Sequence, residues 1–148
     1  MMEADLLVVN GANFEEGMLD VIASAKSDGV MVFEAISVVS QLEGSDDHSD
    51  HGGHDDHEGH DDHHGHDHGG VDPHFFTDPG RMAQVVNQLS DFLVLNFPEI
   101  NGEDLVSHMA DYSKKLTDLD SEVMQTLSSI PESSRVLVTN HEVFAYFA

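Results

Sequence analysis

The sequence predicts an α/β fold built on a parallel sheet. Residues 5–10 form a short apolar run closed by Asn10-Gly11, as expected of a strand buried on both faces. Residues 18–25 then place apolar side chains on one helical face, Asp28-Gly29 marks the end of that helix, and residues 30–39 are again rich in β-formers. A strand, a helix and a strand within about 35 residues indicate a βαβ unit with parallel strands.

Two helices are expected after residue 78. Asp78-Pro79 offers an N-cap followed by proline at the first helical position, and apolar residues then keep a helical period until Pro98. A longer helix is expected over residues 103–129, where apolar residues recur every three or four positions before Pro131. At about 1.5 Å per residue this helix would be about 40 Å long, which is long for a domain of this size.

The last part of the sequence predicts a further buried strand at residues 135–139. Asn140-His141 and an apolar stretch, residues 143–147, follow it before the sequence ends. Natural C-termini are more often polar and exposed. The apolar end therefore favours a polypeptide that has been cut.

An insert, residues 44–72, differs from the rest of the chain in composition. The 148 residues carry 29 acidic and 5 basic side chains, for a net charge of −24, and the insert holds ten of the acids, no Lys or Arg, and nine of the twelve histidines. This charge excludes nucleic acid as a direct partner and argues against an anionic membrane surface. Because the insert has almost no apolar residues to offset its ordering entropy, we expect a disordered loop.

The histidines of the insert recur at every third residue and then crowd together. They are His48, His51, His54, His57, His60, His63, His64, His66 and His68. Imidazole beside carboxylate oxygen suits Zn²⁺, and less selectively Cu²⁺ or Ni²⁺, so the composition favours metal capture over a plain acidic linker. A flexible loop should bind modestly, and protons compete for imidazoles that titrate near about pH 6.5. Cysteine is absent, which excludes a thiolate zinc site.

Two further histidines lie in stiffer surroundings. His74 lies between prolines and beside aromatic residues in the stretch 72–79, and His141 directly follows the predicted strand 135–139. Side chains at the carboxyl ends of parallel strands face the crevice where open α/β sheets bind ligands, so the two histidines would converge there. Taken alone, each is more readily a structural histidine. His108 lies off the apolar stripe of the long helix and is expected at the surface.

Three blocks of the sequence, in this order, carry a resemblance to a known family. They are residues 4–11 with Glu15, residues 72–79 with the His/Asp tract before them, and residues 140–147. Together they resemble the metal-binding solute-binding proteins of bacterial ABC transporters for zinc and manganese.

The resemblance implies a periplasmic or other extracytoplasmic protein with two Rossmann-like lobes, joined by one long helix, that hold the metal between them. The chain would then divide into parts of a first lobe, the insert as a loop, the helix between the lobes, and the start of a second lobe that is mostly missing. Their bounds are 1–43 and 73–100 for the first lobe, 44–72 for the loop, 101–131 for the helix and 132–148 for the second lobe.

The family's ligands are usually three histidines and one carboxylate. By motif, His74 matches the second histidine and His141 the third, whereas the first histidine and the carboxylate have no counterpart here. Zinc sites need three or four protein ligands, so we expect half of a site and therefore a fragment. The absence of a signal-peptide pattern at the N-terminus fits the same expectation.

Zinc is the expected ligand, because a His-rich loop is associated with the zinc importers of the family and imidazole suits Zn²⁺ better than Mn²⁺. Manganese stays open, since the fourth ligand is unseen. The expected function is capture of Zn²⁺ and its delivery to an ABC transporter permease, by a protein that is monomeric when full length.

We do not expect an enzyme, because protein ligands would close the zinc site and no His-Glu-x-x-His motif is present. The alternative is a free-standing histidine-rich metal buffer or chaperone, which becomes more plausible if the chain is complete as written.

Overall fold

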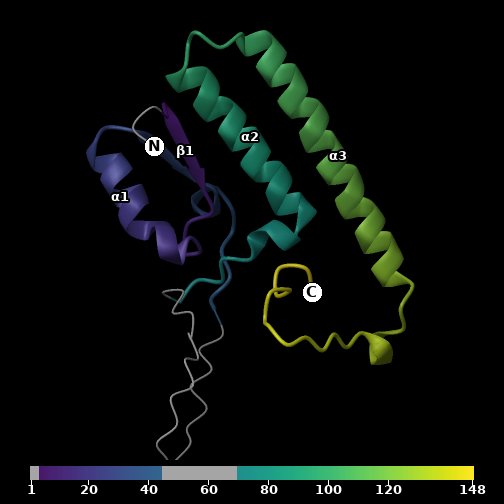
Figure 1. Ribbon diagram of the computed structural model, residues 1–148. Helices are drawn as coiled ribbons and strands as arrows, with labels where there is room; N and C mark the ends of the chain where they lie inside the picture. The colour runs from purple at the N-terminus through teal and green to yellow at the C-terminus, as the bar shows by residue number, and fades with distance from the viewer. Residues whose placement is uncertain (1–3, 45–69) are drawn as a thin grey trace, which may run out of the picture.

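A two-stranded parallel sheet begins the fold. The computed structural model describes residues 4–44 and 70–148 (Figure 1). Strand β1 (Leu6–Val9) and strand β2 (Met31–Glu34) pair in parallel. Helix α1 (Leu19–Ser27) connects them and ends before Gly29, whose φ of +91° suits glycine. The predicted strand, helix and strand are confirmed, and with them the α/β class.

Two long helices follow and lie side by side (Figure 1). Helix α2 (Pro79–Asn96) begins as the sequence predicts, with Pro79 in its first turn and the Asp78 side chain accepting a hydrogen bond from the Arg81 N–H at 3.1 Å. Helix α3 (Gly102–Ser128) has 27 residues and matches the predicted helix 103–129 closely. Among the described residues, no helix combines the length and apolar character that a membrane span requires.

The core forms where β2 and the 3-10 turn Ala35–Val38 meet α2 and the end of the chain. Its buried members come from segments far apart in the sequence. They are Phe33, Ala35, Ile36, Val39, Phe75, Val85 and Tyr146. Phe75 is 2% exposed and directly follows His74, so the core fixes the backbone at the candidate site.

The prediction that residues 5–10 form a strand buried on both faces is wrong in the described chain. Val8 in β1 is 52% exposed, and the apolar face of α1 leaves Leu19 and Val21 39% and 45% exposed. The second run, 30–39, is a strand only as far as Glu34 and then becomes the turn Ala35–Val38. Parallel strands are buried only where neighbouring strands and helices cover them, and the described residues supply two strands.

The predicted strand at residues 135–139 is also absent. This segment is irregular, and Val136, Leu137 and Val138 are 77%, 61% and 86% exposed. A strand needs a neighbour to accept and donate its backbone hydrogen bonds, and in the part of the chain that the structure describes no strand pairs with this segment. Local β-propensity alone therefore overstated its order.

The two ends of the insert are paired and ordered, contrary to the expectation of a disordered loop over all of 44–72. Residues 42–44 and 70–72 form a short antiparallel stem, in which the Asp72 N–H donates to the Leu42 carbonyl at 3.0 Å and the Gly44 N–H donates to the Gly70 carbonyl at 3.0 Å. Residues 45–69, which include the nine histidines of the insert, lie outside the described residues. The stem therefore marks where the insert leaves the fold.

Candidate metal site

His74 is held by Asp72 in the segment between the stem and α2. The two side chains are buried, and the Asp72 Oδ1 atom lies 2.7 Å from His74 Nδ1 while also accepting the His74 backbone N–H at 2.9 Å. An ionised carboxylate can only accept, so Nδ1 carries the proton and Nε2 is the nitrogen suited to a metal. A carboxylate behind a histidine fixes the ring and raises its basicity as a ligand.

The loop after β1 also supports this pair. The Asn10 side-chain amide donates to the Pro73 carbonyl at 3.0 Å, which attaches the loop to the backbone next to His74. Glu15 in turn accepts the backbone N–H groups of Asn10 at 2.5 Å and Gly11 at 3.3 Å. Gly11 has a φ of +88°, and a Cβ atom there would lie 2.8 Å from Ile36, so the tight turn needs glycine. Glu15 thus acts here as a support of the loop.

His141 meets His74 although it comes from the last segment of the chain. The two ring centroids are 5.3 Å apart and the ring planes cross at 86°. His74 is buried, whereas His141 is exposed. The structure therefore brings together the two histidines that the sequence singled out, and their role as metal ligands stays a prediction.

Two phenylalanines lie beside the His74 ring. The rings of Phe14 and Phe76 each lie edge-on at 5.9 Å from the His74 ring and 5.4 Å from each other. Each phenylalanine is 42% exposed. These contacts restrict the imidazole, and apolar groups around a metal site control its access to solvent.

The described residues do not form a complete set of metal ligands. Among residues 4–44 and 70–148, no group of three or more His, Cys, Asp or Glu side chains is placed to hold a metal ion. His108 is exposed on α3, as expected. Two imidazoles supply half of a tetrahedral zinc site, so further ligands or water would complete the coordination.

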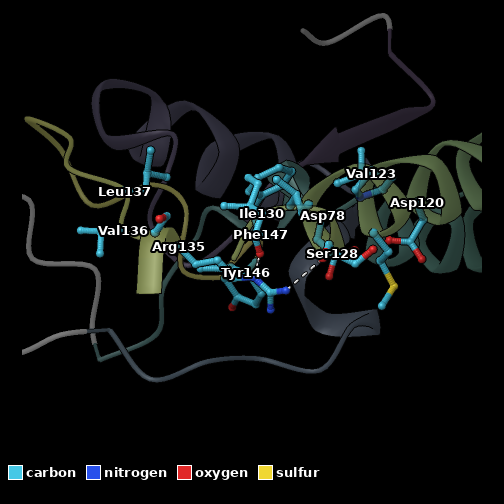
Figure 2. Close-up of a pocket in the computed structure, with 15 residues that line it drawn as sticks. Asp78, Asp120, Val123, Ser128, Ile130, Arg135, Val136, Leu137, Tyr146 and Phe147 are labelled. Atoms are coloured by element: carbon cyan, nitrogen blue, oxygen red, sulfur yellow. Dashed lines mark hydrogen bonds between the residues drawn. The ribbon is translucent and has the colours of Figure 1, made fainter. Parts of the chain in front are cut away.

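A groove of about 730 Å³ lies elsewhere, and neither His74 nor His141 lines it (Figure 2). Its walls come from the C-terminal half of α3, residues 134–137 and the last turn of the chain. Arg135 donates from Nε to the Ile130 carbonyl at 2.8 Å, which satisfies a carbonyl just after α3. Most of the side chains that line this groove are apolar, so it offers no imidazole ligands like those of His74 and His141.

Asp72 and Tyr146 lie within the stretches 72–79 and 140–147, and the sequence alone predicted no role for either. For Asp72 the sequence did carry a signal. An Asp followed by proline favours a turn in which the Asp carboxylate accepts the backbone N–H group two residues later. For Tyr146 no local signal existed, because its hydroxyl bonds to Asp72 and Leu42, which are far away in the sequence.

Comparison with known proteins identifies the family. Residues 1–148 match the family model described as zinc-uptake complex component A, periplasmic, or ZnuA. The chain belongs to the ZnuA family. This family is a metal-binding transport component and not a family of enzymes, so the resemblance seen in the sequence is confirmed.

Two relatives of this ZnuA-family chain show how much of a longer protein it matches. The metal-binding protein YtgA of Chlamydia muridarum (strain MoPn / Nigg) is 34% identical over 76 residues, which are 51% of this chain and 23% of YtgA. The zinc-binding protein AdcA of Streptococcus pyogenes serotype M3 (strain ATCC BAA-595 / MGAS315) is 30% identical over 150 residues, which cover 100% of this chain and 28% of AdcA. The matches thus span about a quarter of these relatives. The family and AdcA are named for zinc, and none of the three names specifies manganese.

Proposed function

We propose that this chain is the metal-capturing part of a zinc ABC uptake system, which binds Zn²⁺ outside the cytoplasmic membrane and delivers it to a membrane permease. The observation that carries the proposal is the 5.3 Å approach of the His74 and His141 rings in a chain of the ZnuA family. Two imidazoles in one place favour a borderline cation such as Zn²⁺ over Mn²⁺, which prefers oxygen ligands.

His74 and His141 would divide the work of binding between them. His74 presents Nε2 because Asp72 holds Nδ1 at 2.7 Å, so half of the pair is oriented before the metal arrives. His141 lies on an exposed segment and would bring the second imidazole. Release to a permease would then begin with movement of the His141 segment, because it has less burial to lose than the His74 segment.

The longer architecture implied by the resemblance is part of the proposal. Helix α3, with 27 residues, would be the helix between two Rossmann-like lobes, and residues 132–148 would begin the second lobe. The exposure of Val136 and Val138 supports this arrangement, because an apolar segment of that kind would be covered by further strands of a lobe.

The insert would collect or buffer zinc beside the site. Its nine histidines and ten acids form a set of nitrogen and oxygen ligands, and its stem ends at Asp72, two residues before His74. Metal held weakly there would raise the local supply of Zn²⁺ to the stronger site.

One observation favours a second candidate, a histidine-rich metal buffer in which the folded part is a scaffold. The described residues lack a group of three or more potential ligands. In that case the insert alone would account for zinc binding, and substitutions at His74 and His141 would have no effect.

The two candidates can be separated with a variant of the 148-residue chain in which the nine insert histidines are replaced by asparagine, called here the insert-silenced chain. Calorimetric titration of this chain with Zn²⁺ should show one remaining site. His74→Ala or His141→Ala should remove most of that binding, whereas the exposed His108→Ala on α3 should leave it unchanged. If the insert-silenced chain bound no zinc, or if His74→Ala bound zinc as before, the buffer would be the better description.

A further inference from the structure

Tyr146 joins the two strands of the stem through a single hydroxyl group. The Tyr146 hydroxyl donates to the Asp72 carbonyl at 2.8 Å and accepts the Leu42 N–H at 2.9 Å. Leu42 and Asp72 are themselves paired across the stem. Tyr146 is 6% exposed, so these are buried hydrogen bonds that water cannot readily replace.

The Tyr146 ring is fixed as well. The Arg81 guanidinium carbon lies 4.7 Å from the centroid of the Tyr146 ring, within the range of a cation–π contact. Arg81 is held in turn, because its Nε donates to the Ser40 carbonyl at 3.2 Å and its guanidinium pairs with Asp78. The ring and the hydroxyl of Tyr146 are therefore both held by residues from the first part of the chain.

The contacts of Tyr146 connect the two candidate ligands. Asp72, which accepts the tyrosine hydroxyl on its carbonyl, holds the His74 ring with its carboxylate. Tyr146 also belongs to the same terminal segment as His141. Within that segment the Val143 N–H donates to the His141 carbonyl at 3.1 Å, and the Phe147 N–H donates to the Phe144 carbonyl at 3.0 Å.

Among the described residues, the segment before His141 is attached by exposed hydrogen bonds and not by buried ones: Arg135 donates to the Ile130 and Ser128 carbonyls, and the Thr139 hydroxyl donates to the His141 carbonyl at 2.7 Å. Val136, Leu137 and Val138 are largely exposed, so they contribute little packing that would place His141. The buried anchor nearest to His141 is Tyr146, which lies five residues later along a locally folded turn.

We propose that Tyr146 is a positioning residue of the metal site. Its hydroxyl ties the segment that carries His141 to Asp72, and so sets the spacing between the His141 and His74 imidazoles. The inference rests on the proposed function, since it takes these two histidines as ligands. Mutation of groups that support the ligands of metal sites typically lowers metal affinity about 10–100-fold. Removal of this hydroxyl should lower zinc affinity about tenfold.

The test is Tyr146→Phe in the insert-silenced chain, which removes the hydroxyl and keeps the ring. Zinc affinity is measured by following the His74 imidazole resonances in a two-dimensional NMR titration, with the assignment taken from His74→Ala. We expect affinity to fall about tenfold in Tyr146→Phe. The matched control is Tyr112→Phe, since Tyr112 is 50% exposed on α3, and its affinity should equal that of the parent.

A double-mutant cycle separates positioning from general loss of structure. If Tyr146 acts by placing His141, then Tyr146→Phe should weaken zinc binding only while His141 is present and should add nothing to His141→Ala. An equal loss in both backgrounds, or no loss in either, would overturn the inference. If His141→Ala itself left affinity unchanged, the proposed function would fail first, and the two failures are distinguishable.

A measurement on the unsubstituted chain covers the case in which Tyr146→Phe does not fold. Zinc that holds His141 should also hold Tyr146, so hydrogen exchange of the Leu42 amide, which donates to the tyrosine oxygen, should slow several-fold when Zn²⁺ is added. The Phe97 amide, which donates to Leu93 at the end of α2, serves as the internal reference. Equal exchange of Leu42 with and without Zn²⁺ would contradict the inference.

Discussion

The segments that carry His74 and His141 contribute the same side chain to one place by different means. The His74 segment is buried, leads into helix α2, and has its imidazole bonded to a carboxylate at 2.7 Å. The His141 segment is exposed and follows three apolar residues that are at least 61% exposed. One half of the candidate site is therefore built into the core, and the other half is attached to it through Tyr146. In the proposed function, such a pair would bind a metal while keeping one ligand easy to withdraw.

The largest expected effect is a difference in stability between the alanine variants of the two histidines. His74→Ala should lower the free energy of unfolding by about 1–3 kcal/mol without metal, because it leaves the buried Asp72 carboxylate without its imidazole partner. His141→Ala removes an exposed side chain and should change stability by under about 0.5 kcal/mol. Urea denaturation followed by circular dichroism measures both. Equal losses would show that the two segments are not energetically different.

A smaller effect is expected from Asp72→Asn. The amide keeps the shape of the carboxylate and still accepts the Nδ1 proton, but it loses the charge that makes His74 a stronger ligand, so zinc affinity should fall about tenfold. Calorimetry on the insert-silenced chain measures this change. The control is Asp118→Asn, whose exposed carboxylate pairs with Lys114 on the surface of α3, and it should bind zinc as the parent does. A normal affinity for Asp72→Asn would leave Asp72 with a structural role alone.

The smallest effect concerns the exposed apolar residues before His141. Val138 is 86% exposed, so Val138→Thr should change the free energy of unfolding by less than about 0.5 kcal/mol. The buried Val85 in α2 is the matched comparison, because the same Val→Thr change places a hydroxyl in the core and should cost about 1–3 kcal/mol. Thermal unfolding of the two variants measures the difference. A large loss for Val138→Thr would mean that this segment is covered in solution.

Local patterns predicted the elements that depend on neighbouring residues. Short stretches of sequence specify the turn at Asp28-Gly29, the cap at Asp78 and the apolar period of α3. The structure confirms the three helices that these signals predicted. The strand at 135–139 failed because burial of a strand depends on partners elsewhere in the fold. Contacts between residues far apart in the sequence were likewise not predictable from local patterns.

Two residues of the candidate site could be predicted from the sequence, but the contacts that place them could not. His74 and His141 stood out by their sequence context, and their rings do meet. The hydroxyl of Tyr146 bonds to a backbone N–H that is 104 positions away, and no periodicity or spacing encodes such a contact. The part played by Asn10, whose amide reaches the Pro73 carbonyl, was hidden for the same reason.

The stem at the base of the insert has a consequence for how freely this protein can vary. The chain leaves the described fold and returns to it at one point, because the Gly44 N–H donates to the Gly70 carbonyl at 3.0 Å. The entropy of closing a loop grows with the logarithm of its length, at about 0.6 kcal/mol for each doubling. Residues could therefore be added or removed between the two glycines at little cost in the stability of the described fold. If the insert captures metal as proposed, its capacity could then change without altering the architecture that presents His74.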